Sequence, residues 1–250
     1  MLSDSQLRRY ARNIALDGVG VVGQEKLLAS SALVVGAGGL GASLLSYLAA
    51  AGVGHIGIVD HDRVELSNLQ RQTIFEHADI GRLKVEAAKD RLSELNPELK
   101  ITVYPYKITA QNAEEIIAGY DIIADGSDNF ATRFAVNSAC HNLQKTLVSG
   151  AVRAYAGQMA VFKSYLPEQP CYRCFVGGLP DDEQSCSNAG IIGASAGIIG
   201  SLQALQAIKE LLNIGESFAG QLLLFDAISL KNRIVKIGKD SNCQICGGNS

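Results

Sequence analysis

The chain has 250 residues, of which 47% are hydrophobic and 19% are charged. This size and composition fit one large α/β domain with its own core and argue against disorder. The formal net charge of −3 excludes the broad basic surface that non-specific nucleic-acid binding requires. The N-terminus lacks the basic and apolar regions of a secretion signal, and polar residues interrupt the uncharged stretch 184–208. We therefore expect a cytoplasmic protein that does not insert into a membrane.

The apolar pattern alternates between strands and helices through the first part of the chain. Ser3 and Gln6 resemble a capping box ahead of a short helix that reaches Ile14, and a loop is expected at 18–23. Strands are expected at 32–35, 55–60, 101–104, 120–125 and 146–149, with helices after 36–41 and at 83–95, 113–118 and 130–143. This βαβα order predicts an α/β fold with a Rossmann-like, doubly wound parallel sheet.

The pattern changes after Gly150. A strand is expected at 157–162, a long functional loop at 164–187, a long apolar helix at 191–212, and closing strands at 221–225 and 233–237. We predict a single domain over 1–250. Its nucleotide-binding half covers 1–150, and the crossover loop, the long helix, the closing strands and a metal-bearing β extension cover 151–250.

A glycine pattern points to a nucleotide. Gly36, Gly38 and Gly41 satisfy G-x-G-x-x-G between a predicted strand and a predicted helix. Glycine lets the backbone approach phosphate oxygens, and the helix N-terminus adds oriented N–H groups. Asp60 lies 19 residues past Gly41, where a carboxylate can accept both ribose hydroxyls. The pattern predicts a nucleotide site without separating NAD, FAD and ATP, and a purely structural turn is the alternative.

Four of the six cysteines form two C-x-x-C pairs, Cys171/Cys174 and Cys243/Cys246. Because a secretion signal is absent, metal binding or redox chemistry is favoured over disulfides. Four thiolates leave no open coordination position, which predicts structural Zn²⁺. A thioredoxin-like site is disfavoured because neither pair is expected to open a helix in a βαβ unit, and four ordinary free cysteines are the remaining alternative. Cys140 is expected to be a small buried residue.

Five spaced motifs occur together along the chain. They are Ser67-Asn68-Leu69-Gln70-Arg71-Gln72, Gly81-Arg82-Leu83-Lys84, Ser127-Asp128-Asn129, Cys171-Tyr172-Arg173-Cys174 and Cys243-Gln244-Ile245-Cys246. Jointly they resemble the HesA/MoeB/ThiF family, the bacterial relatives of ubiquitin-activating enzymes, from about Arg9 to Gly247. None of the motifs is specific alone, but their combination is.

The resemblance implies a role for each of these site residues. Gly39 and neighbouring amides would line an ATP site, Asp60 would hold the ribose, and Asn68, Arg71 and Lys84 would contact phosphates. Asp128 would hold Mg²⁺, with Asn129 beside it in the nucleotide site. Arg12 resembles the arginine that the family supplies across a homodimer interface. Cys186 lies where some members use a cysteine for a thioester or persulfide link to the carrier protein.

The implied reaction is ATP-dependent adenylation of the C-terminal glycine of a small ubiquitin-like sulfur-carrier protein that ends in Gly-Gly. Its carboxylate is ionised at neutral pH, so the attack on the α-phosphorus needs positive charge from Arg, Lys and Mg²⁺ rather than a general base. The molybdopterin-synthase small subunit is favoured over the thiamine-pathway carrier. Because no rhodanese-like domain follows Cys246, sulfur is expected from a separate sulfurtransferase or desulfurase. The alternatives from other classes are an NAD-dependent oxidoreductase and an inactive carrier-binding scaffold.

Overall fold

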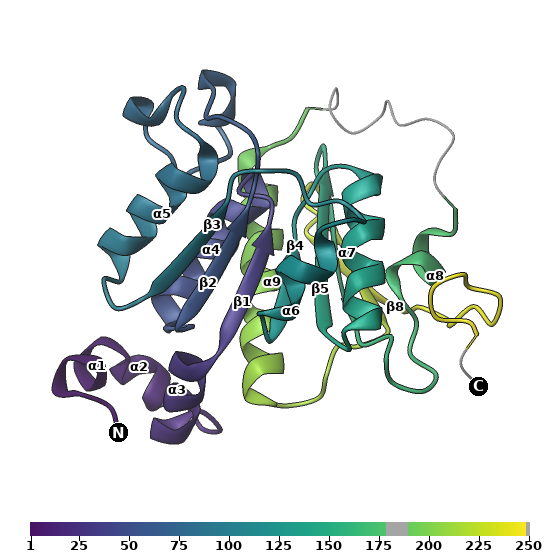
Figure 1. Cartoon of the computed structure of the whole chain (residues 1–250), viewed down its shortest axis with the longest axis horizontal. Helices are drawn as coiled ribbons and strands as arrows, with labels where there is room; N and C mark the ends of the chain where they lie inside the picture. The colour runs from purple at the N-terminus through teal and green to yellow at the C-terminus, as the bar shows by residue number, and fades with distance from the viewer. Residues whose placement is uncertain (179–189, 249–250) are drawn as a thin grey trace.

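The computed structural model describes residues 1–178 and 190–248, which are built around an eight-stranded sheet. The strand order is β3-β2-β1-β4-β5-β6-β7-β8 (Figure 1). The strands are β1 Ser31–Val35, β2 His55–Val59, β3 Lys100–Tyr104, β4 Ile122–Asp125, β5 Thr146–Arg153, β6 Ala156–Phe162, β7 Gln221–Asp226 and β8 Lys231–Lys236. The expected Rossmann-like order is therefore confirmed for the first five strands.

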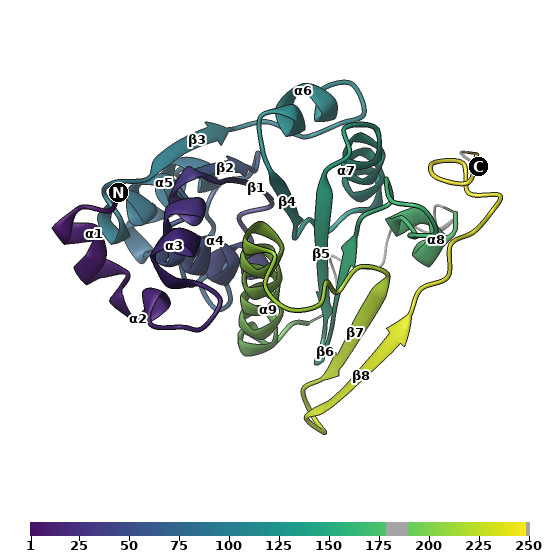
Figure 2. The same ribbon diagram turned by 90° about the horizontal axis from the view of Figure 1, so that it is seen from below.

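The sheet is parallel in one half and antiparallel in the other. The pairs from β3 to β5 are parallel, and the pairs from β5 to β8 are antiparallel. The change occurs at the hairpin between β5 and β6, where Ala154 adopts a left-handed backbone with φ of 53°. The antiparallel strands form the predicted β extension, which projects away from the nucleotide half (Figure 2).

Helices cover both faces of the sheet. They are α1 Asp4–Arg9, α2 Ala11–Ile14, α3 Gly20–Ala29, α4 Gly39–Ala51, α5 Lys84–Leu95, α6 Ala113–Ala118, α7 Phe130–Asn142, α8 Tyr172–Val176 and α9 Gly193–Leu212, with 3₁₀ turns η1 Leu66–Asn68 and η2 His77–Asp79. Figure 2 shows α4 and α9 on one face and α6 and α7 on the other. None of these helices is long and apolar enough to cross a membrane.

Side chains of the parallel strands alternate between two cores. On β1, Ala32 and Val34 pack with α4 and α9, whereas Leu33 and Val35 pack with residues of α6 and α7. All four side chains are at most 2% exposed. A strand buried on both faces reads as a continuous apolar run, which is why the sequence pattern located β1 correctly.

Long-range contacts change the predicted boundaries near the N-terminus. The helix expected to reach Ile14 is interrupted at Tyr10, whose buried hydroxyl accepts a hydrogen bond from Asn96 Nδ2 at 2.8 Å. The loop expected at 18–23 was wrong in part, because α3 begins at Gly20. Gln24 and Leu27 on α3 are fully buried, so packing against the body favours the helix despite its glycines.

The expected loop at 164–187 was also wrong in part, because it contains α8. Tyr172 on α8 packs edge-on against Phe134 and Phe162, which gives this short helix a hydrophobic support. The long helix expected from 191 begins at Gly193, and β5 extends beyond the expected end at 149 to Arg153.

Candidate active site

The glycine pattern forms a tight connection between β1 and α4. Gly36 has a left-handed backbone with φ of 94°, and a Cβ atom there would lie 3.2 Å from the carbonyl of Gly126 in the loop after β4. A Cβ atom on Gly41 would lie 2.2 Å from the Gly36 carbonyl oxygen, so this position requires glycine. On Gly39 it would lie 3.1 Å from Ala196 on α9. The glycines thus permit three backbone segments to meet at the N-terminus of α4.

Asp60 follows β2 at the edge of this glycine loop. Its Oδ2 accepts a hydrogen bond from the Ala37 N–H at 2.8 Å, and its Oδ1 accepts one from the Asp62 N–H at 2.9 Å. Each carboxylate oxygen has two lone pairs, so both can still accept a hydrogen bond from a ligand hydroxyl. The side chain is half-buried. Its position suits the predicted contact with a ribose.

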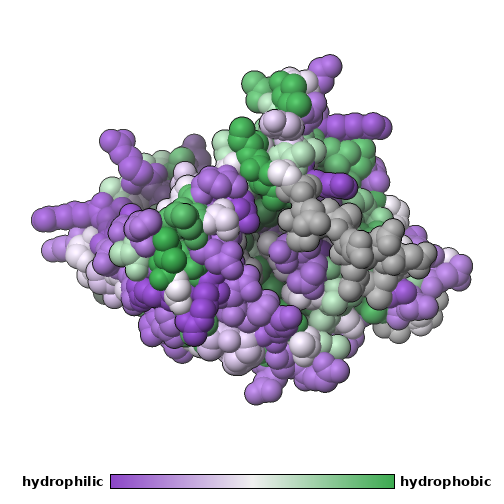
Figure 3. All heavy atoms as spheres, turned by 90° about the horizontal axis from the view of Figure 1, so that it is seen from above, coloured by the Kyte–Doolittle hydropathy of each residue, from purple (hydrophilic) through white to green (hydrophobic). Residues whose placement is uncertain are grey.

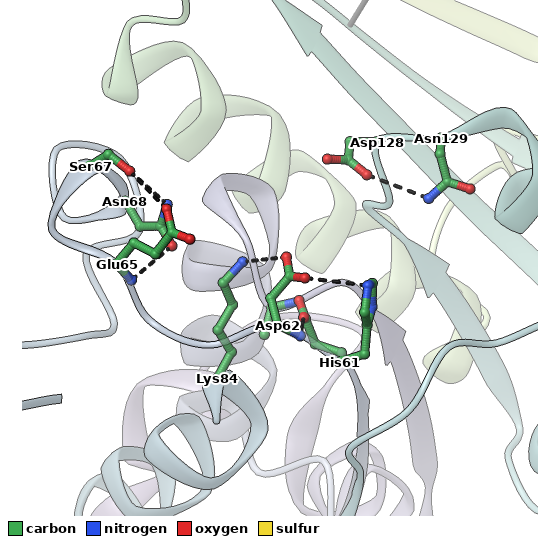
Figure 4. A network of polar contacts seen from close by, with 10 residues as sticks. His61, Asp62, Glu65, Ser67, Asn68, Lys84, Asp128 and Asn129 are labelled. Carbon is green, nitrogen blue, oxygen red and sulfur yellow. Dashed lines mark hydrogen bonds and ion pairs between the residues drawn. The ribbon is translucent and has the colours of Figure 1, made fainter. Parts of the chain in front are cut away.

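Lys84 begins α5 and forms an ion pair with Asp62. Its buried Nζ donates to Asp62 Oδ2 at 2.9 Å, and His61 Nε2 lies 3.3 Å from Asp62 Oδ1 (Figure 4). Burial alone would raise the pKa of Asp62, but the hydrogen bond and charge of Lys84 outweigh it and hold the pKa below its usual range. Asp62 therefore neutralises Lys84 in this structure.

Asn68 and Arg71 belong to a short turn beside this pair. Asn68 ends η1 and is buried, and its Oδ1 accepts a hydrogen bond from the Glu65 N–H at 3.2 Å. Its Nδ2 donates to Ser67 Oγ at 3.4 Å (Figure 4). Arg71 Nη1 donates to the Ser67 carbonyl at 3.1 Å. A guanidinium has five N–H groups, so one bond to the main chain leaves donors for an anion.

Asp128 and Asn129 lie on the loop between β4 and α7. The Asp128 side chain is exposed, and its Oδ1 is 3.5 Å from Asn129 Nδ2 (Figure 4). Asn129 Oδ1 caps α7 by accepting a hydrogen bond from the Thr132 N–H at 2.9 Å. Asp125 is buried at the end of β4 and accepts from the Ser127 N–H at 2.9 Å. Asp125 is therefore engaged within the loop, whereas the Asp128 carboxylate is exposed to solvent.

These residues meet at one edge of the sheet, where the parallel strands end. Figure 3 looks onto this face, on which hydrophilic side chains surround a hollowed centre and apolar residues gather in smaller patches. Crevices at the carboxyl ends of parallel strands are the usual ligand sites of doubly wound sheets. The structure brings the glycine loop, Asp60, Lys84 and Asp128 to this edge of the sheet, and their roles toward a ligand stay predictions.

One predicted residue, Arg12, stands apart from this edge. Arg9, just before the α2 segment that carries Arg12, donates to the carbonyl of Leu95 at the C-terminal end of α5. Lys84 is at the opposite end of this 12-residue helix, which spans about 18 Å at 1.5 Å per residue. Figure 1 accordingly shows α2 at the other end of the molecule from the glycine loop. Cys186 lies outside the described residues.

The start of α9 contributes contacts that sequence reasoning missed. A Cβ atom on Gly193 would lie 2.5 Å from the Gln70 carbonyl oxygen and 3.1 Å from Arg71 Cα. Together with the contact between Ala196 and Gly39, this packs α9 against both the glycine loop and the Arg71 segment. Gly193 and Gly200 in this largely apolar helix are the signal that could have indicated a close backbone approach, since a Cβ atom on Gly200 would lie 2.2 Å from the Leu40 carbonyl oxygen.

The four paired cysteines converge on one small site. The Sγ–Sγ distances are 3.9 Å for Cys171–Cys174, 3.6 Å for Cys171–Cys243 and 3.3 Å for Cys174–Cys246. A tetrahedral zinc site with Zn–S bonds of about 2.3 Å has edges of roughly 3.8 Å, so the set fits this ion. Burial raises the pKa of the Cys171 thiol to about 11, which is unfavourable for thiolates unless a cation binds them.

The first cysteine pair opens a short helix, but not one in a βαβ unit. Cys171 is the N-cap of α8. The flanking strands β6 and β7 are antiparallel neighbours, so the helix is not part of a βαβ unit, and the argument against a thioredoxin-like site still holds. Cys140, on α7, is buried as expected.

Comparison with known proteins gives consistent matches across the chain. The ThiF family matches residues 10–245. The sulfur carrier protein adenylyltransferase of Thermus thermophilus is 44% identical over 97% of this chain and 91% of its own length. The adenylyltransferase and sulfurtransferase MOCS3 of Drosophila virilis is 45% identical over 98% of this chain, which spans 55% of that protein. A crystal structure of Escherichia coli MccB with ATP superposes with a TM-score of 0.83 at 22% identity, over 96% of this chain and 73% of that one.

The ion pair of Asp62 with Lys84 predicts a pH-dependent stability. Because the folded-state pKa of Asp62 is lowered, its contribution is present above the unfolded value of about 3.8 and is lost as pH falls through the folded value. Asp62 is half-exposed, so Asp62→Asn should cost about 1 kcal/mol or less at pH 7. We expect the difference between parent and variant in denaturant unfolding to shrink as pH falls below 3.8 and through the lowered folded-state pKa of Asp62.

The matched control is Glu94→Gln, which removes a carboxylate from an exposed pair with Arg91 at 3.6 Å. It should change the free energy of unfolding by no more than about 0.5 kcal/mol at either pH. A penalty of Asp62→Asn that persists undiminished at low pH would mean that the carboxylate charge is not its source.

Proposed function

The chain belongs to the ThiF family and is an adenylyltransferase, and from this premise we propose that it uses Mg-ATP to adenylate the C-terminal glycine of a small ubiquitin-like sulfur-carrier protein. The observation that carries the proposal is the meeting of Asp60, Lys84 and Asp128 around a glycine loop at one edge of the sheet. Adenylation would prepare the carrier for conversion to a thiocarboxylate.

In the proposed site each group has a separate task. Asp60 holds the ribose hydroxyls, and the N–H groups of the glycine loop approach the phosphates at the start of α4. Asn68 and Arg71 bind phosphate oxygens, with Arg71 using the N–H groups that Ser67 does not engage. Asn129 supports Asp128 from the helix cap.

Lys84 supplies positive charge to the phosphates. In the free protein its buried ammonium is paired with Asp62. The charge is therefore already desolvated, and the ion pair holds it in place. Asp128 would hold Mg²⁺, an ion that neutralises charge developing on the departing pyrophosphate. The carrier carboxylate then attacks the α-phosphorus without a general base, because it is ionised at neutral pH.

The identity of the carrier is the finer part of the proposal. We favour a carrier of the molybdopterin-synthase small-subunit type, ending in Gly-Gly, on overall likeness, with the thiamine-pathway carrier as the second candidate. A separate sulfurtransferase or desulfurase would provide the sulfur. Cys186 is proposed only for a later covalent step, as a thioester or persulfide link to the carrier. The cytoplasmic location stays a prediction.

An NAD-dependent oxidoreductase would use the same glycine loop and Asp60. Family membership favours adenylation over this alternative, and hydride transfer leaves Arg71, Lys84 and Asp128 without a role. Retention of NAD(H) by the purified protein would support the oxidoreductase. An inactive carrier-binding scaffold would bind the carrier but give no exchange in the assay described below.

We also propose a homodimer in which Arg12 acts in the partner's site. The exposed position of Arg12, far from the Lys84 end of α5 in its own chain, supports this arrangement. The neighbouring α3 and α9 present exposed apolar side chains, including Val22 at 79% and Leu205 at 51% exposure. A second copy covering this face would bury them and bring Arg12 to a phosphate.

The adenylation step predicts Mg-ATP-dependent pyrophosphate exchange when a Gly-Gly carrier is present. Asp128→Ala should lower the exchange rate by about a hundredfold or more, because it removes the proposed Mg²⁺ ligand. The charge-matched control Glu115→Ala, on the exposed face of α6, should stay near the parent rate. Cys186→Ala should remain within about tenfold, roughly 1.4 kcal/mol, since adenylation requires nothing of a thiol. Undiminished exchange in Asp128→Ala would remove the proposed metal role.

The cysteine cluster predicts about one Zn²⁺ per chain in freshly purified protein. Removing the ion with a chelator should lower the melting temperature. Structural zinc contributes roughly 10–16 kcal/mol in small metal-dependent peptides, which is an upper guide for a chain with its own core. Elemental analysis should find the zinc lost in Cys171→Ser and retained in Cys140→Ala, which changes a buried cysteine outside the cluster. A zinc-free parent protein would refute the assignment.

The shared site predicts complementation between two inactive variants. Arg12→Ala chains and Asp128→Ala chains should each lack exchange activity. After subunit exchange, each mixed dimer would hold one site with both residues intact, so activity should return to about a quarter of the parent, given random pairing. The two variants kept separate are the control. No recovery, despite subunit exchange shown by mass spectrometry, would argue that Arg12 does not act across the interface.

A further inference from the structure

Arg133 on α7 carries a charge that is almost completely buried, with 6% of the residue exposed. Its Nη1 donates to Ser149 Oγ at 3.1 Å, and its Nη2 donates to the carbonyl oxygens of Gly150, at 2.7 Å, and Ser127. Within the described part of the chain no carboxylate forms an ion pair with it. Burying a charge costs free energy unless the group is hydrogen-bonded. Arg133 therefore depends on these three acceptors, and it connects the segments that carry them.

One of the acceptors is the residue before Asp128. The Ser127 N–H donates to the Asp125 carboxylate at 2.9 Å, and the Ser127 carbonyl accepts from Arg133. Ser127 is thus held at both ends by charged side chains. On the other side of Asp128, the Asn129 side chain caps α7. Within the described residues the exposed Asp128 carboxylate is hydrogen-bonded only to Asn129, so the bonds on either side hold the backbone that carries it.

The same loop lies directly against the glycine loop. A Cβ atom on Gly36 would be 3.2 Å from the Gly126 carbonyl and 3.3 Å from the Ser127 nitrogen. The carbonyl of Gly150, at which β5 passes the end of β4, is the second main-chain acceptor of Arg133. Arg133 therefore joins the loop that carries Asp128 to the neighbouring strand of the sheet.

Arg133 also contacts the helix that begins at the first cysteine pair. Its guanidinium carbon lies 5.8 Å from the ring centroid of Tyr172, the residue after Cys171. The Tyr172 N–H donates to Asn137 Oδ1 at 2.8 Å. Asn137 stands four residues after Arg133 on the same face of α7. One helix face thus contacts both the Asp128 loop and the helix that begins at the cysteine cluster.

We propose that Arg133 is a positioning residue, which holds the Asp128 loop in the geometry that binds Mg-ATP and connects this loop through Tyr172 to the four-cysteine site. This inference rests on the proposed function. Arginine suits the task because its planar fork reaches several acceptors at once while its face stacks on an aromatic ring. A lysine would keep the charge but not this pattern of bonds.

The test compares two ligands in the full-length protein by calorimetry. In Arg133→Lys and Arg133→Met, the affinity for Mg-ATP should fall about tenfold or more, because Asp128 is misplaced. The affinity for adenosine, which depends on Asp60 and needs no metal, should stay within about threefold. The control is Arg173→Met, which removes an arginine stacked on Phe134 at 5.5 Å in the same contact between α7 and α8. It should leave both affinities near those of the parent.

A milder substitution covers the case in which the Arg133 variants do not fold. Ser149→Ala removes one acceptor of Arg133 without removing the charge, and should weaken Mg-ATP binding about two- to fivefold. If neither Arg133 variant folds, the Mg-ATP affinity of Ser149→Ala decides the test alone. Unchanged Mg-ATP affinity, or an equal loss for adenosine and Mg-ATP, would overturn the positioning role. A parent protein that does not bind Mg-ATP would instead refute the proposed function.

The connection to the cysteine cluster has its own measurement. Hydrogen exchange of the backbone amides in 126–129 should become about tenfold faster when a chelator strips the parent protein of metal. In Arg133→Lys or Ser149→Ala, whose loop is already loosened, metal removal should add little. Exchange in 126–129 that is unchanged in the stripped parent would refute the connection.

Discussion

The close approach of two backbone loops between β1 and β4 is the constraint on which the rest of the site depends. The chain leaves these neighbouring strands in opposite directions, which opens the space in which doubly wound folds bind ligands. Gly36 lies against Gly126 and Ser127 with no room for a side chain. The glycine loop and the loop carrying Asp128 are therefore one packed unit. In the proposed function, a nucleotide held by the first would lie beside the loop that carries Asp128.

The charges around this unit are matched within the protein before any ligand binds. Lys84 is paired with Asp62, and Asp60 accepts two main-chain N–H groups. Arg133 is satisfied by carbonyl and hydroxyl oxygens. Pre-paired groups are already desolvated and oriented, so a polyanionic ligand can replace one partner without extensive reorganisation. Asp128, by contrast, is exposed, and within the described residues its carboxylate has only a long contact with Asn129.

The antiparallel half of the sheet serves a different purpose. Strands β6 to β8 carry the chain back to the second cysteine pair, so that cysteines 72 residues apart approach within 3.3–3.6 Å. The cluster fixes α8, whose Tyr172 packs against α7. The cysteine site is remote from the glycine loop in sequence, yet it is separated from the Asp128 loop by a single helix. This arrangement allows metal binding at one site to influence order at the other.

The sequence by itself determined the features that depend on local pattern. Buried parallel strands read as apolar runs, so β1, β2 and β4 could be located from the sequence. The spacing of Gly36, Gly38, Gly41 and Asp60 follows from a single βαβ unit, so it predicted a nucleotide site at this edge of the sheet. The two C-x-x-C pairs likewise predicted a metal-binding site. Together with the motif resemblance, these patterns predicted a doubly wound parallel sheet and named the candidate site residues.

Only the tertiary structure decided the features that depend on contacts between distant segments. The start of α3, the break at Tyr10 and the existence of α8 follow from packing against residues far along the chain. The side-chain oxygen of Asn129 caps α7, and Asp62 forms an ion pair with Lys84, which lies 22 residues further along the chain. Arg133 has no signal in the sequence, because its three acceptors lie on two other segments and become neighbours only when β4, β5 and α7 pack together. A side chain that acts through distant main-chain oxygens leaves no pattern of residue types to recognise, and so its role emerges only from the fold.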